Sequence, residues 1–99
     1  MEEWNSSAEI IAMSLIANSG AARSLAFEAL KKEKLAEFDA AKELMDEANS
    51  VILKAHHSQT DLLQEEAQGN GHQLSILLVH AQDHFMTSLL AIDLITEMI

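Results

Sequence analysis

The chain has 99 residues, of which 48% are hydrophobic and only 4% aromatic, and its formal net charge is −10. A single domain of this length, residues 1–99, buries a modest core and gains from covering an apolar face with another copy of itself. Only six Lys and Arg residues are present, which excludes nucleic acid as a partner and suits a basic protein instead. The absence of cysteine excludes disulfides and thiolate chemistry.

Apolar residues at helical spacing predict a first helix over about residues 4–32. Gly20 lies inside it, and a glycine in the interior of a helix lowers helix stability by about 1 kcal/mol relative to alanine. It therefore indicates either a bend or, as the favoured interpretation, close packing by a neighbouring helix. The first twenty residues match neither a signal peptide nor a membrane span, so a cytoplasmic location is expected. The predicted core stripe is Trp4, Ala8, Ile11, Leu15, Asn18, Ala22, Leu25 and Ala29.

Two further helices are predicted, over about residues 37–67 and from about residue 72 to the end, separated by the turn sequence QGNG at 68–71. Together the three segments predict an all-α, antiparallel three-helix bundle of up-down-up topology. The chain ends inside an apolar helical pattern, so a short polar tail has either been removed or never existed. The second stripe is Phe38, Ala41, Met45, Ala48, Ile52, Ala55, Gln59 and Leu62, and the third is Leu74, Leu78, Ala81, Phe85, Leu89, Ile92 and Ile99.

The third predicted helix has a second face of mixed character. At about 100° per residue, apolar residues there enclose a line of polar ones, whereas a solvated face would carry Lys and Glu. Such a face is usually buried, which favours self-association about a symmetry axis. The residues of this face are Ile76, His80, Asp83, His84, Thr87, Ala91 and Leu94.

Two kinds of metal site are compatible with this face. Carboxylates of Asp83 that converge on an axis would need protonation or a hard cation such as Mg²⁺ or Ca²⁺, although an exposed aspartate is the simpler interpretation. His80 and His84, four residues apart, could hold zinc, but no Cys or Glu beside them completes a tetrahedral set. Away from this face, His56 and His57 are interpreted as an exposed pair and His72 as part of the turn.

Two segments carry a resemblance to a known family: NSGAARSLAFEALKKEKLAEFDAAKELMDEA and LLVHAQDHFMTSLLAIDLITEMI. They closely resemble the lactose/cellobiose-type IIA component of the bacterial phosphoenolpyruvate-dependent sugar phosphotransferase system. The resemblance covers about Ile10 to Ile99 and is nearer to the cellobiose and N,N'-diacetylchitobiose branch. One departure is Phe85, where the family often has leucine; the other is the early chain end, which could weaken a trimer or a partner contact.

The resemblance implies a phosphocarrier. His80 would take a phosphoryl group from the phosphohistidine of HPr and pass it to a cysteine of the cognate IIB, in support of uptake of a β-linked disaccharide. The resemblance further implies a homotrimer in which Asp83 of each subunit binds a central metal ion, commonly Mg²⁺. The membrane would be reached only indirectly, through the IIC transporter.

A neutral imidazole is a nucleophile at physiological pH, so His80 is expected to present Nε2 outward and to have its other nitrogen fixed by a hydrogen bond. Phosphoryl transfer needs alignment and charge stabilisation. His84 is expected to support or orient the reacting histidine. The candidate donors to the phosphoryl oxygens are Thr87, Ser24 and Arg23, with Gln82 able to contribute only across a subunit boundary.

Two rival functions remain open from the sequence. A two-component histidine phosphotransfer domain is also helical, but it typically has lysine and glycine shortly after its histidine, whereas AQDHF follows His80. A structural or adaptor bundle without chemistry would show the same helical periodicity. Such an adaptor would undergo no mass change that depends on HPr.

Overall fold

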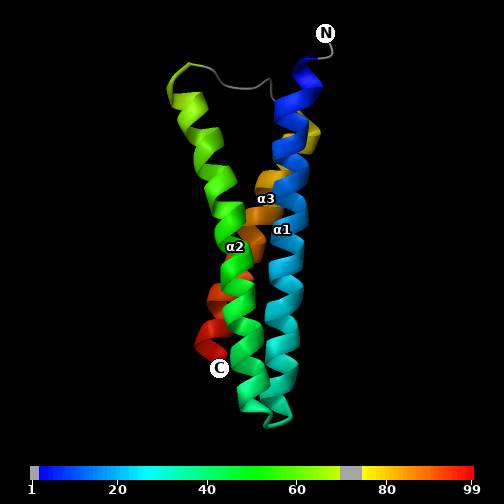
Figure 1. Cartoon of the computed structure of the whole chain (residues 1–99), viewed down its shortest axis with the longest axis vertical. Helices are drawn as coiled ribbons and strands as arrows, with labels where there is room; N and C mark the ends of the chain where they lie inside the picture. The colour runs from blue at the N-terminus through cyan, green and yellow to red at the C-terminus, as the bar shows by residue number, and fades with distance from the viewer. Residues whose placement is uncertain (1–2, 70–74) are drawn as a thin grey trace.

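The computed structural model describes residues 3–69 and 75–99, and the side chains from Glu9 onward. Three helices make up the fold: α1 (Glu3–Lys34), α2 (Phe38–Ala67) and α3 (Ile76–Met98). Within the described ranges there is no strand, so the all-α prediction is confirmed. In Figure 1, α1 descends from the N-terminus, α2 returns beside it and α3 descends again, giving a rod 53 Å long.

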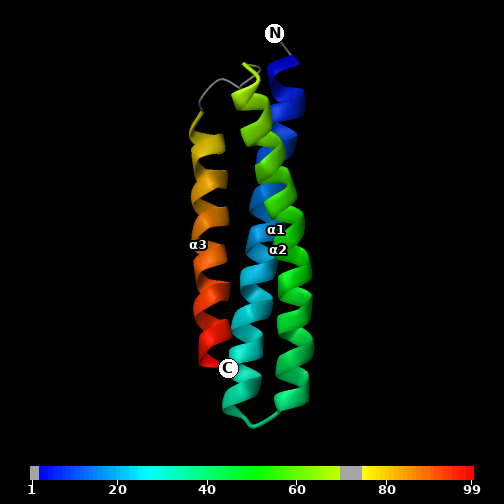
Figure 2. The same ribbon diagram turned by 90° about the vertical axis from the view of Figure 1, so that its left-hand side faces the viewer.

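The helix α1 is the central element of the bundle. Figure 2 shows α1 between α2 and α3, and α3 packs mainly on α1 while it contacts α2 much less. The α1 helix runs unbroken through Gly20, so the glycine marks no break in the helix. Residues 9–34 are long and apolar enough to span a membrane by length and composition, a property that core helices of bundle proteins share.

The two described helix ends at the first connection follow the expected electrostatics. Lys31, Lys32 and Lys34 occupy the last turn of α1 and Asp39 the first turn of α2, where the helix dipole favours cations and anions respectively. Between the helices, Ala36 adopts a left-handed φ of 62°, and the amide of Glu37 donates to the carbonyl of Lys32 at 2.9 Å. This hydrogen bond closes the end of α1 in the manner of a Schellman cap.

The start of α3 differs from the prediction. Ser75 is extended, with φ −143°, and its hydroxyl accepts a hydrogen bond from the amide of Leu78 at 3.1 Å. Serine is a preferred N-cap because its oxygen satisfies an otherwise unpaired amide of the first turn. The helix therefore begins at Ile76 and not at about residue 72. Positions 70–74, including half of the predicted turn, His72 and Leu74, lie outside the described residues.

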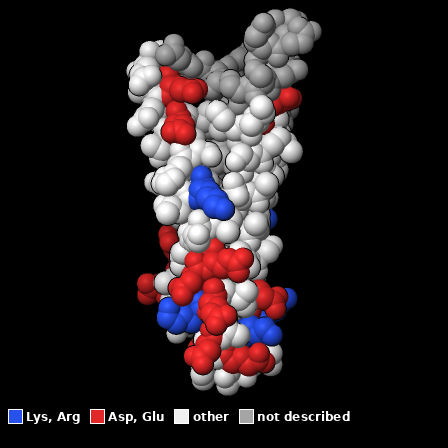
Figure 3. All heavy atoms as spheres, in the orientation of Figure 1, with Lys and Arg blue, Asp and Glu red and all other residues white. Residues whose placement is uncertain are grey.

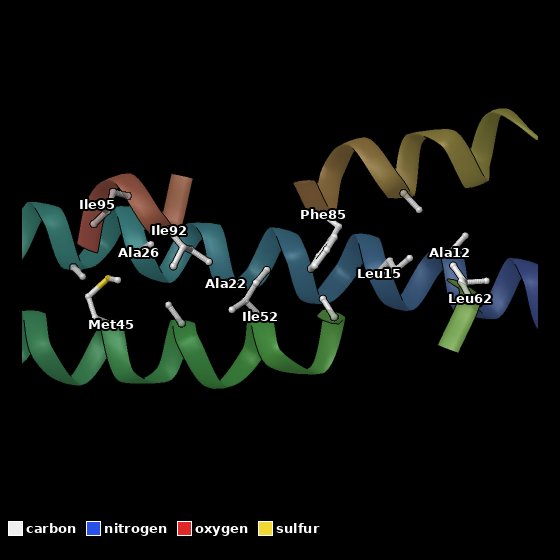
Figure 4. Close-up of a cluster of buried hydrophobic side chains, with 14 residues drawn as sticks. Ala12, Leu15, Ala22, Ala26, Met45, Ile52, Leu62, Phe85, Ile92 and Ile95 are labelled. Atoms are coloured by element: carbon white, nitrogen blue, oxygen red, sulfur yellow. The ribbon is translucent and has the colours of Figure 1, made fainter. Parts of the chain in front are cut away.

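The core is built mostly from alanine, with a few larger side chains between the helices. Figure 4 shows Phe85 and Ile92 reaching from α3 toward α1, and Ile52 and Met45 reaching in from α2. Alanine allows helices to pack closely, and the larger side chains fill the space that remains. The buried hydrophobic residues are Ala12, Leu15, Ala22, Ala26, Ala29, Ala41, Met45, Ala48, Ile52, Ala55, Leu62, Ala81, Phe85, Ile92 and Ile95.

The predicted stripes are partly wrong at their ends. Phe38 and Ile99 were placed in the core, but they are 59% and 42% exposed. Phe38 is the first residue of α2 and Ile99 follows the last residue of α3, so neither is enclosed by the other helices. Ile95, which the third stripe omitted, is 3% exposed.

Two serines, Ser19 on α1 and Ser88 on α3, are fully buried, and their hydroxyl oxygens have no hydrogen-bond partner among the described residues. A buried hydroxyl without a partner costs about 1–3 kcal/mol. We therefore expect Ser88→Ala to raise the free energy of unfolding by about 1 kcal/mol more than Ser50→Ala, a change at an exposed position of α2 that shares the same gain in helix propensity. Equal midpoints of the two variants in urea would show that the hydroxyl of Ser88 carries no penalty.

Candidate functional site

The polar residues predicted to share one face of α3 lie together on the surface of the chain. His80, Asp83 and Thr87 are exposed, while His84 is half-buried. At about 100° per residue, Asp83 lies on the side of α3 opposite to the buried Ala81, Phe85 and Ile92. The candidate residues of α3 therefore lie outside the core of the single chain.

The ring of His80 is accessible and close to a second imidazole. Its centroid is 5.4 Å from that of His84, and the planes are tilted by 36°. The structure places the ring in no hydrogen bond with any residue that it describes, so the expected hydrogen-bond partner for one nitrogen is not among these residues. An exposed imidazole with both nitrogens free can act as a nucleophile at neutral pH.

The ring of His84 is instead held against α1. Nη2 of Arg23 lies 3.5 Å from Nε2 of His84. A Cβ atom added to Gly20 would lie 3.4 Å from the same nitrogen, which is van der Waals contact. The His84 ring of α3 therefore faces α1 at Gly20, but at a distance that would also accommodate the methyl group of an alanine.

The surroundings of His84 lower its pKa below the usual value of 6.5. Burial of the ring is the largest cause, since it penalises the charged form, and the Arg23 guanidinium and His80 act in the same direction. Asp83 acts in the opposite direction without overcoming them. His84 is therefore neutral at pH 7.

This shift makes folding stability depend on pH. Because the folded chain disfavours protonated His84, the unfolded chain binds more protons once the pH falls below about 6.5. The contribution of His84 to stability is therefore complete above that pH, is lost as the pH falls toward the lowered pKa, and is constant below it. In urea titrations between about pH 8 and pH 5, wild type should lose more stability on acidification than His84→Gln. Parallel curves for the two proteins would contradict the lowered pKa.

The remaining supporting candidates are arranged differently from the prediction. Arg23 contacts His84, and no described contact joins it to His80. The hydroxyl of Thr87 donates to the carbonyl oxygen of Asp83 at 2.8 Å, with that of His84 3.3 Å away, so its hydrogen is already used within α3. Ser24 is exposed on α1 and Gln82 is half-buried on α3.

The described residues of one chain do not gather the ligands of a metal site. No group of three or more His, Asp or Glu residues that could hold an ion occurs in the described part of the chain. Asp83 alone supplies carboxylate oxygens at the exposed centre of α3, which are ligands that Mg²⁺ accepts, so a complete site would need carboxylates from several copies. On α2, His56 and His57 are exposed as predicted, and the His56 ring lies 6.1 Å from that of Phe85.

Charge is distributed unevenly along the rod. In the view of Figure 3, acidic and basic side chains gather around the connection between α1 and α2, while the middle of this face is largely uncharged apart from an isolated basic side chain.

Comparisons with known proteins agree with the residue pattern. The sequence profile of the family described as PTS system, lactose/cellobiose specific IIA subunit, matches residues 10–99. The N,N'-diacetylchitobiose-specific EIIA component of Escherichia coli (strain K12) is 50% identical over 91 residues, which are 92% of this chain and 78% of the relative.

Solved structures of IIA proteins are also similar to this chain. A cellobiose-specific enzyme IIA from Bacillus anthracis matches with a TM-score of 0.89 and 46% identity, covering 93% of this chain and 84% of the other. The IIA(chitobiose)–HPr complex from Escherichia coli matches with a TM-score of 0.78 and 48% identity, covering 92% and 88%. The chain belongs to the lactose/cellobiose-specific IIA family of the phosphotransferase system.

Proposed function

We propose that this protein is a phosphocarrier that accepts a phosphoryl group from phospho-HPr on His80 and donates it to a cysteine of a cognate IIB. The observation that carries the proposal is the exposed His80 ring, 5.4 Å from His84 and without a hydrogen bond among the described residues. A relative at 48% identity has been solved in complex with HPr, which supports the same donor for this chain.

The proposed transfer exchanges one phosphorus–nitrogen bond for another. A ring nitrogen of His80, taken as Nε2, attacks the phosphorus of phosphohistidine on HPr, the bond to the HPr imidazole breaks, and its electron pair returns to that ring. The second step forms a phosphorus–sulfur bond on IIB and frees His80. Both steps have loose transition states that require alignment more than covalent assistance, which rigid presentation from α3 supplies.

Cationic and hydroxyl groups near His80 are proposed to stabilise the phosphoryl oxygens. Arg23 is held at His84, whose ring centroid is 5.4 Å from that of His80, and a guanidinium recognises phosphoryl oxygens well. Ser24 follows it on α1 and is exposed. Thr87 would first have to release its hydrogen bond to the carbonyl of Asp83, and Gln82 would act from a neighbouring subunit.

We further propose that the antiparallel three-helix chain assembles as a homotrimer through α3. Six large apolar side chains of α3 are more than half exposed, and with Asp83 they follow one side of the helix. An apolar stripe at spacings of three and four residues is the pattern of a helix that packs against copies of itself. These side chains are Ile76, Val79, Met86, Leu90, Leu94 and Met98.

Asp83 lies in the middle of this stripe, so a three-fold axis along it would bring three carboxylates together. Three like charges withdrawn from water need a cation or protons, and oxygen ligands suit Mg²⁺. The ion would supply charge neutralisation between subunits, while Asp83 of each chain would hold it. No step of the phosphoryl relay uses this ion.

The proposed setting is the bacterial cytoplasm, where HPr and IIB would be met and the membrane reached only through IIC. The formal charge of −10 favours encounter with basic protein surfaces. The relatives named for cellobiose and N,N'-diacetylchitobiose support a β-linked disaccharide as the sugar that the pathway imports.

The proposal is tested by incubating the chain with phosphoenolpyruvate, enzyme I and HPr. We expect a mass increase of one phosphoryl group that requires HPr, and peptide mapping under alkaline conditions should place it on His80. Addition of a cognate IIB should remove it. A chain whose mass does not change with HPr would be an adaptor bundle, and the proposed function would be wrong.

A further inference from the structure

Two neighbouring imidazoles on α3 raise a question of selectivity. His80 and His84 have ring centroids 5.4 Å apart, so a phosphodonor that reaches one ring comes within a few ångströms of the other. Histidine is intrinsically able to form covalent phosphoryl intermediates. Some feature of the fold must decide which ring reacts.

The two rings differ in what α1 does to them. Nε2 of His84 has Nη2 of Arg23 at 3.5 Å, and a Cβ atom added at Gly20 would be in ordinary van der Waals contact with the same nitrogen, at 3.4 Å. His80 is exposed, and its ring has no such partner in the described part of the chain. The contacts from α1 therefore cover one nitrogen of one ring only.

This contact has a chemical consequence for both nitrogens of His84. A guanidinium can only donate hydrogen bonds, so Nε2 of His84 is the acceptor and its lone pair is occupied. In a neutral imidazole the proton then lies on Nδ1, which leaves that nitrogen without a free lone pair. A single contact thus makes both nitrogens of His84 poor nucleophiles.

We propose that Arg23 determines the phosphorylation site by holding His84 in a form without a free lone pair, so that His80 reacts in preference. Nη2 of Arg23 lies 3.5 Å from Nε2 of His84 and occupies it. In this choice between the two rings, Arg23 is a positioning residue that acts through His84. The part concerning phosphorylation rests on the proposed function, whereas the difference in reactivity between the two rings does not.

The reactivity difference can be measured without any partner protein. Diethyl pyrocarbonate acylates imidazole nitrogens that have a free lone pair, and mass spectrometry resolves the rate at each histidine of the intact, assembled protein. In wild type we expect His84 to react about tenfold more slowly than His80, the ratio that one hydrogen bond from a charged donor corresponds to. Equal rates at His80 and His84 would overturn the proposal.

A matched pair of variants separates the hydrogen bond from simple burial. Arg23→Met retains a long side chain over the ring but has no donor, and it should raise the rate at His84 toward that of His80. Lys31→Met removes the same charge from α1 at an exposed position and should leave the ratio unchanged. An unchanged ratio in Arg23→Met would also overturn the proposal, because shielding alone would then explain the slow reaction.

The tautomer gives a readout that shielding does not affect. In two-dimensional ¹H–¹⁵N spectra of the imidazoles, wild-type His84 should show a protonated Nδ1 and an unprotonated Nε2. Arg23→Met should shift it toward the form protonated on Nε2, because the hydrogen bond that fixes the tautomer is gone. A His84 ring protonated on Nε2 in wild type would contradict the assignment directly.

Finally, the small phosphodonor phosphoramidate tests the transfer chemistry in the absence of HPr. His80→Gln should acquire phosphohistidine at position 84 about tenfold more slowly than His80→Gln combined with Arg23→Met. Equal rates at His84 in the two variants would overturn the inference while leaving the HPr-dependent function of His80 intact. Conversely, a wild-type chain that ignores HPr but shows the reactivity difference would contradict the proposed function alone.

Discussion

Replacement of His80 by glutamine is expected to reduce the rate of HPr-dependent phosphorylation by at least about 10³-fold, because it removes the covalent acceptor and with it the reaction path. Glutamine approximates the polarity of imidazole, and His80 is exposed on α3, so the fold should be retained. The rate is measured with enzyme I, HPr and labelled phosphoenolpyruvate, and circular dichroism checks the helices.

His56→Gln is the matched control for this experiment. His56 is an exposed histidine on α2 that contacts the ring of Phe85, and the proposed mechanism does not use it. This variant should accept the phosphoryl group at the wild-type rate. If His80→Gln still became fully phosphorylated by HPr, the acceptor would be another residue and the role assigned to His80 would be wrong.

The second helix was the part of the fold best predicted from the sequence. Its stripe contains Ala41, Met45, Ala48, Ile52, Ala55 and Leu62, all of them buried in the structure. The prediction succeeded because the other faces of this helix are mostly polar, with Leu53 and Leu63 as exposed exceptions, so one apolar stripe stands out. Phe38 was misplaced because periodicity does not show where the neighbouring helices end.

The other two helices are more ambiguous, since each carries apolar residues on more than one side. On α1 the sequence favoured Asn18, whereas Ser19 is the fully buried residue and Asn18 is half-buried. On α3 the exposed Leu90 and Leu94 are as apolar as the buried Ile92 and Ile95. Where a helix carries apolar residues on two sides, periodicity alone does not show which of the two sides faces the other helices of the same chain.

The candidate site was predictable where it depends on spacing along one helix. The i, i+4 relation of His80 and His84 predicted neighbouring rings, and the structure confirms it. The contact between Arg23 and His84 depends on the register of α1 against α3, which no local pattern encodes. The hydrogen bond of Thr87 to the carbonyl of Asp83 could have been expected, because threonine within helices often bonds four residues back.

Replacement of Asp83 by leucine is expected to strengthen the proposed homotrimer and abolish its response to divalent cations. A cluster of converging carboxylates would be exchanged for apolar packing continuous with Val79, Met86 and Leu90, and such exchanges stabilise assemblies by up to about 1–4 kcal/mol. The wild-type trimer should melt at a lower temperature in EDTA than in Mg²⁺, since removal of the cation leaves like charges together. The variant should melt at one temperature in both buffers.

Asp61→Leu separates this effect from a general gain in hydrophobicity. Asp61 is exposed on α2, away from the α3 stripe, so its replacement should preserve the difference between EDTA and Mg²⁺. Sedimentation should report trimers for all three proteins, with dissociation of Asp83→Leu at the lowest concentration. Asp83→Leu could instead sediment as a monomer while its melting temperature still responded to Mg²⁺. The carboxylate would then be an assembly contact with no role in binding the ion. The axial position inferred from the centre of the α3 stripe would be wrong.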